Sequence, residues 1–89
     1  MISSTFVAPG QSASINGKKL SVLMTYGATG TVALECYDDG LAAWTAVASY
    51  TAAPAEQPVV VDDVVRRPWR LNCTAVTGTI TYVMRNEQD

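Results

Sequence analysis

Carboxylates are the residues of this sequence most capable of catalysis or metal binding. Asp38 and Asp39 are adjacent, Glu35 shortly precedes them, and Asp62 and Asp63 form a second pair. Neighbouring residues of an extended chain point to opposite sides, so neither pair can flank one substrate bond as glycosidase carboxylates do. A Ca²⁺ ion held by Glu35 and the first pair would need about six to eight oxygens. Turn formation at Asp38-Asp39-Gly40 and local pairing of Asp62 and Asp63 with nearby arginines are the better explanations.

The sequence contains no histidine, which removes the commonest general base and most catalytic triads. Cys36 and Cys73 therefore cannot form a cysteine–histidine pair or a four-ligand zinc site. We expect both to be buried thiols, and a disulfide between them and a reactive thiol are the alternatives. Phosphate-binding glycine motifs are also missing. The sequence predicts a protein that is not an enzyme and that uses no cofactor or metal.

Residues 66–70, Arg-Arg-Pro-Trp-Arg, hold three of the six basic residues. Arginine forks bind carboxylates, so Arg66 and Arg67 are predicted to contact a partner or another subunit. Trp69 either anchors the same contact or packs in the core, and Arg70 is predicted to face solvent. We also predict contacts from the N-terminal segment, through Ile2 and Phe6.

Tyr37 and Trp44 are of the type that stacks on sugars in carbohydrate-binding modules. Such stacking needs aromatic rings exposed on one face. Trp44 and Tyr50 are predicted to lie on the same face of one strand, with two alanines between them. That spacing favours a packed face, so sugar binding is an alternative that the pattern does not favour.

Alternation of apolar and polar residues, typical of half-buried strands, is clearest in residues 19–26, 31–36, 44–50, 69–74 and 79–84. Shorter candidates cover residues 5–8, 12–15 and 58–62. Glycine and aspartate turns separate the runs, and residues 51–57 are predicted to form a loop. Pro68 is expected to end any strand ladder there. The pattern predicts an all-β fold, a small antiparallel β-sandwich or jelly-roll-like barrel of about seven or eight short strands, with little or no helix.

The 89 residues are enough for a single domain, residues 1–89. Within it, residues 1–8 are predicted to be an extended N-terminal arm and residues 86–89 a mobile tail. Charged residues make up 16%, against about 25% in a typical domain, and the net charge is −2. These values argue against nucleic acid and anionic membranes as partners. The N-terminus has no basic residue and no long apolar run, so we expect no signal peptide and no secretion.

Residues 35–44, Glu-Cys-Tyr-Asp-Asp-Gly-Leu-Ala-Ala-Trp, resemble the strand, Asp-Gly turn and tryptophan unit of many short bacteriophage virion proteins. The alanine-rich residues 51–55 and residues 70–81 are similar to the loop and final hairpin of that family, whereas residues 59–68 depart from it. The resemblance, which covers roughly residues 20–85, implies a β-sandwich or jelly-roll component of a virion.

The function that this resemblance implies is that of a capsid decoration or cement protein. Such a protein binds the major capsid protein, or other virion proteins, commonly as a homotrimer. Its location would be the virion, after assembly in the host cytoplasm. A tail, neck or head-fibre component is one alternative, and a carbohydrate-binding host-attachment module is another.

Overall fold

A computed structural model describes the backbone of residues 1–51 and 56–88, with side chains described in 1–51 and 66–88. The strands are β1 (Ile2–Phe6), β2 (Gly10–Gln11), β3 (Ile15–Tyr26), β4 (Gly30–Asp38), β5 (Ala43–Thr51), β6 (Glu56–Val76) and β7 (Ile80–Asn86). All of their pairings are antiparallel. The described residues include no helix, so none that could cross a membrane.

Burial follows the predicted alternation most regularly in β3 and β7. In β3, Val22 and Met24 are buried, while Leu23 between them and Ser21 and Thr25 on either side are exposed. The pattern confirms the predicted all-β fold, because side chains of successive strand residues point to opposite sides of the sheet.

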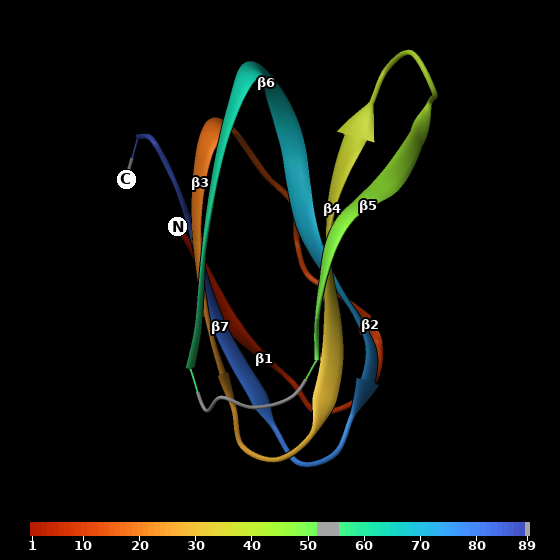
Figure 1. Cartoon of the computed structure of the whole chain (residues 1–89), viewed down its shortest axis with the longest axis vertical. Coiled ribbons are helices and arrows are strands. Elements are labelled where there is room, and N and C mark those ends of the chain that lie inside the picture. Colours follow the sequence, from red (N-terminus) through yellow and green to blue (C-terminus); the bar gives the residue numbers. More distant parts are fainter. Residues whose placement is uncertain (52–55, 89) are drawn as a thin grey trace.

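The strand order is β1-β7-β3-β6-β4-β5, with β2 added beside β6. The first part of β6 pairs with β3, from Glu56 opposite Thr25 to Trp69 opposite Ile15. Its last part pairs with β4, from Trp69 opposite Cys36 to Val76 opposite Gly30. Figure 1 shows β6 arching from the side of the molecule that holds β1, β7 and β3 to the side that holds β4 and β5. The hydrogen-bonded strands therefore form the two layers of a sandwich, one with β1, β7, β3 and the first part of β6, and the other with the last part of β6, β4 and β5.

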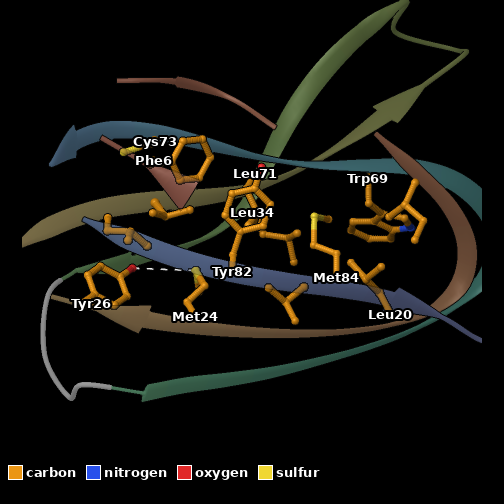
Figure 2. Close-up of a cluster of buried hydrophobic side chains, with 14 of the residues drawn as sticks. Phe6, Leu20, Met24, Tyr26, Leu34, Trp69, Leu71, Cys73, Tyr82 and Met84 are labelled. Atoms are coloured by element: carbon orange, nitrogen blue, oxygen red, sulfur yellow. Dashed lines mark hydrogen bonds between the residues drawn. The ribbon is translucent and has the colours of Figure 1, made fainter. Parts of the chain in front are cut away.

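The core lies between the two layers and receives side chains from both (Figure 2). Trp69 is 3% exposed, and its indole Nε1 donates a hydrogen bond of 3.1 Å to the Gly17 carbonyl. Phe6 is stacked on Tyr82 with ring centres 4.8 Å apart. The fully buried side chains are Leu20, Val22, Met24, Val32, Leu34, Leu71, Cys73, Ile80 and Met84.

Two of the predicted turns are confirmed in the structure. In the turn after β4, the Gly40 amide donates a 2.8 Å hydrogen bond to Asp38 Oδ1, as expected for an aspartate that bonds its own turn. Between β6 and β7, Gly78 has φ of +82°, a conformation that glycine adopts without steric cost.

The N-terminal segment differs from its prediction. Residues Ile2–Phe6 form β1 and pair with β7, so the segment is an edge strand rather than an extended arm. At the other end, residues up to Asn86 belong to β7, and the Glu87 carboxylate accepts hydrogen bonds from the Lys18 and Lys19 amides. Asp89, the last residue of the predicted tail, lies outside the described residues.

The prediction that Pro68 ends the ladder is wrong. Pro68 lies opposite Asn16 inside β6, and the β4 ladder begins only at Trp69, so the missing amide costs no bond to β4. A register shift in the pairing with β3 falls between Gly17 and Lys19, close to this proline. The predicted loop 51–57 is also shorter than expected, because Glu56 and Gln57 begin β6; residues 52–55 lie outside the described part.

Leu71 is 0% exposed, and its truncation to alanine should remove core contacts that the surrounding strands cannot replace. We expect Leu71→Ala to lower the free energy of unfolding by about 2–5 kcal/mol. Leu41→Ala is the matched control, since Leu41 is 67% exposed, and it should change stability by less than about 0.5 kcal/mol. Urea unfolding measures both, and equal losses would contradict the described core.

Candidate functional site

A register shift in the pairing of β4 with β5 decides which side chains of β5 face solvent. Leu34 lies opposite Ala48, but Glu35 lies opposite Ala46, so Val47 has no partner position in β4. Such a bulge interrupts strict alternation. Trp44 therefore shares the outer face with its partner Tyr37.

Tyr50, beyond the bulge, packs against the core instead. The prediction that Trp44 and Tyr50 share one packed face is accordingly wrong. The argument against an exposed aromatic surface was that Trp44 and Tyr50 lie on one packed face. Since they do not, that argument no longer holds.

The outer face of β6, β4 and β5 carries a connected group of side chains, which we call the outer cluster: Glu35, Tyr37, Trp44, Arg70 and Asn72. Arg70 Nε donates a 2.7 Å hydrogen bond to one Glu35 oxygen, and Asn72 Nδ2 donates one of 3.1 Å to the other. The Arg70 guanidinium carbon lies 4.2 Å from the centre of the Trp44 ring. Trp44 and Tyr37 meet edge to face, with ring centres 5.6 Å apart.

The outer cluster corrects two expectations. Arg70 faces outward as predicted, yet its side chain is only 23% exposed because it lies against Glu35 and Trp44. Glu35 is 9% exposed and uses both carboxylate oxygens within the cluster. It is therefore engaged in an ion pair rather than directed at a calcium ion. The part of the chain that the structure describes contains no group of three potential metal ligands.

A hollow of about 230 Å³ adjoins the cluster at Tyr37, and we call it the Asp39 hollow. Its lining residues are Tyr37, Asp38, Asp39, Arg66, Arg67 and Pro68. The Arg67 Nη1 atom lies 3.7 Å from Asp38 Oδ2. The Asp39 carboxylate is exposed at the rim, on the turn that Asp38 holds through Gly40. The hollow thus combines an aromatic ring with charges of both signs.

Arg66, a predicted contact residue, also lines the hollow. Its Nη2 atom is 2.6 Å from Glu87 Oε1. Hydrogen bonds from the backbone N–H groups of Glu87 itself and of Lys18 hold the pKa of the Glu87 carboxyl below its usual range. Arg66 and Arg67 thus pair with Glu87 and Asp38. The side chains of Asp62 and Asp63, their predicted local partners, lie outside the described residues.

The structure separates the other predicted contact residues from this surface. Trp69 lies in the core, and a side chain that is 3% exposed cannot anchor an interface of the folded chain; the alternative of a core tryptophan is confirmed. Phe6 is 6% exposed, and Ile2 packs against the same core. The predicted N-terminal contacts are therefore wrong for the Phe6 side chain. What β1 presents to solvent is its free backbone edge and the side chains of Ser3, Ser4 and Thr5.

Both cysteines are buried thiols, as expected, and no disulfide joins them. Cys73 is 1% exposed, and burial raises the pKa of its thiol. A thiol of this kind behaves as a small apolar core residue rather than a nucleophile.

The fold places the chain among small antiparallel β-sandwich proteins. It is similar to the crystal structure of the Yersinia pseudotuberculosis-derived mitogen (YPM), with a TM-score of 0.59 over 99% of this chain and 85% of that chain. The two sequences are 14% identical, so the likeness shows a shared fold alone. No protein-family model and no curated protein matches the sequence.

The pairing of Glu35 with Arg70 should make a measurable contribution to stability, since their side chains are only 12% and 23% exposed. In a double-mutant cycle with Glu35→Gln and Arg70→Gln, we expect a coupling energy of about 1–2 kcal/mol. The matched control is the Arg66–Glu87 pair, which is 44% and 24% exposed and should show a smaller coupling. Equal couplings, or none for Glu35 and Arg70, would contradict the described geometry.

The Cys73 thiol should resist alkylation while the chain is folded. Iodoacetamide reacts with thiolate, and both burial and a raised pKa keep the thiolate scarce. At about pH 8 we expect the labelling of Cys73 to be at least about tenfold slower than in urea-unfolded protein. Peptide mass spectrometry measures both rates, and a native rate matching the unfolded one would show that the thiol is accessible.

Proposed function

We propose that the protein is a non-catalytic structural component of a bacteriophage virion, a capsid decoration or cement protein. In this proposal it binds the outer capsid lattice by adding the free edge of β1 to a strand of the capsid protein. The observation that carries the proposal is the regular, uncharged and open edge of β1. Binding of this kind stabilises the lattice because it favours the assembled state by mass action.

The edge of β1 is suited to pairing with another chain. β1 matches β7 over its five residues without a register shift. No other strand among the described residues pairs with it. Ser3, Ser4 and Thr5 are exposed and uncharged, and the exposed Met1 and Val7 flank the strand at 61% and 72%. Such an edge presents unpaired amide and carbonyl groups in strand geometry.

The other long edges carry features that discourage pairing. β5 contains the bulge at Val47, which disrupts its ladder geometry. The first part of β6, which pairs only with β3, includes Pro58 and the charged residues Glu56, Asp62 and Asp63. Bulges, prolines and charges are the usual means by which edge strands avoid other chains. β1 has none of them.

The virion setting is supported by the resemblance to short bacteriophage virion proteins. The two resembling stretches coincide with structural units, since residues 35–44 span the turn between β4 and β5 and residues 70–81 span the turn between β6 and β7. The small fraction of charged residues suits a surface that meets other proteins. A trimer bound to the major capsid protein remains the predicted arrangement.

Lysines on the outer side of β1 should weaken capsid binding. Ser3 and Thr5 alternate with the core-directed Ile2 and Phe6, so Ser3→Lys with Thr5→Lys adds charge at the edge and leaves the core intact. Co-sedimentation with capsids from a phage that lacks the gene should show at least about tenfold weaker binding.

The matched control places the same lysines on β5, as Thr45→Lys with Ser49→Lys, at two exposed positions of that bulged edge. We expect this control to bind like the unchanged protein and to restore capsid heat resistance equally well. Unchanged binding of the β1 variant, or loss of binding in the β5 variant instead, would contradict pairing through β1.

A further inference from the structure

We infer that the outer cluster and the Asp39 hollow together form a binding site for neutral sugar units of a glycan. The site lies on the face of β4, β5 and β6, so it is separate from the β1 edge and does not depend on the proposed capsid function. Four features support the inference: an aromatic surface, hydrogen-bonding groups that are already held in place, a small hollow, and a local charge that disfavours anions.

Trp44 and Tyr37 supply the aromatic surface. They lie on adjacent strands of one outer face and meet edge to face at 5.6 Å. The guanidinium of Arg70 covers one side of the Trp44 ring at 4.2 Å, which holds that ring in place. A sugar ring has an apolar face of C–H groups, and a rigid aromatic ring offers such a face contact at low cost in conformational entropy.

Polar groups beside the rings are oriented before any ligand arrives. Glu35 holds Arg70 through Nε, and among the described residues the hydrogen bond of the guanidinium to protein uses this atom, so its Nη groups can donate to a ligand. Asp38 accepts the Gly40 amide through Oδ1, and the neighbouring Asp39 is exposed on the same turn. A guanidinium fork and a carboxylate can each bond two adjacent hydroxyl groups, which is the pattern a sugar presents.

The charge of the site selects against anions. Arg66, Arg67 and Arg70 pair with Glu87, Asp38 and Glu35, respectively. Asp39 then adds a further negative charge at the rim of the hollow. A binder of phosphate, nucleic acid or acidic sugars needs an excess of positive charge. The balance here favours a neutral ligand.

The dimensions also fit a sugar better than a large protein surface. The hollow of about 230 Å³ is smaller than the roughly 300–1,000 Å³ of sites for drug-sized ligands, so it suits a single sugar ring. Among the side chains that the structure describes, the large apolar ones that are exposed (Met1, Val7, Leu23, Leu41 and Val47) are not part of the outer cluster or of the hollow. A protein interface would be expected to have a broader apolar centre.

Nuclear magnetic resonance of ¹⁵N-labelled protein tests this inference directly. The probes are methyl glycosides of glucose, galactose and mannose, chitotriose, and N-acetylneuraminic acid as the anionic comparison. The indole signal of Trp44 should shift with at least one neutral probe. The indole signal of Trp69 serves as an internal control, because it is buried and bonded to Gly17. A neutral and acidic glycan array extends the search to larger ligands.

Two variants separate binding from folding. Trp44→Ala should weaken binding of the best neutral probe by at least about tenfold, and Asp39→Asn, on an exposed turn, should weaken it without affecting the strands. The matched control Val47→Ala changes an exposed β5 residue outside the cluster and should bind normally. Three results would each overturn the inference. They are no binding of any neutral probe or array glycan, binding of the acidic sugar alone, and unchanged affinity in both Trp44→Ala and Asp39→Asn.

Discussion

The passage of β6 from one layer of the sandwich to the other is the constraint on which the rest of the structure depends. One continuous strand pairs with β3 at its beginning and with β4 at its end, so the two layers cannot move independently. Trp69, Leu71 and Cys73 point from it into the core, while Arg70 and Asn72 point outward to Glu35. The packing of the core thereby fixes the register of the outer cluster, because a slip of one residue would exchange the two sets.

The bulge at Val47 affects two surfaces, the outer face of the β4–β5 pair and the edge of β5. It turns Trp44 outward beside Tyr37, which creates the aromatic part of the outer face. It also interrupts the regular backbone geometry of β5, so that another strand cannot pair along this edge without a break. Pairing is left to β1 at the opposite end of the strand order. One surface is thus suited to backbone pairing and another to side-chain recognition, and neither needs catalytic groups.

The sequence was sufficient to predict the fold class, since alternation in β3 and β7 and the Asp38 and Gly78 turns each have a local cause. It was insufficient where several strands act together. No local pattern marks the bulge that separates Trp44 from Tyr50, because a bulge depends on the partner strand. Arg70 and Glu35 come together through the β4–β6 register, and only their opposite charges gave any signal. The effect of Pro68 on strand pairing could not be predicted either, because a missing amide costs a hydrogen bond only where a partner strand lies opposite, and the pairing with β4 begins at Trp69.

The location and copy number of the protein in the particle test the proposed function most directly. Electron cryomicroscopy of the virion should show this chain at regular positions over the outer surface of the head, in hundreds of copies for a lattice-covering protein, with β1 beside a strand of the capsid protein. A few copies at a single vertex or in the tail would contradict a decoration protein and favour the tail, neck or head-fibre alternative. Absence from the purified particle would contradict a structural role in the virion altogether.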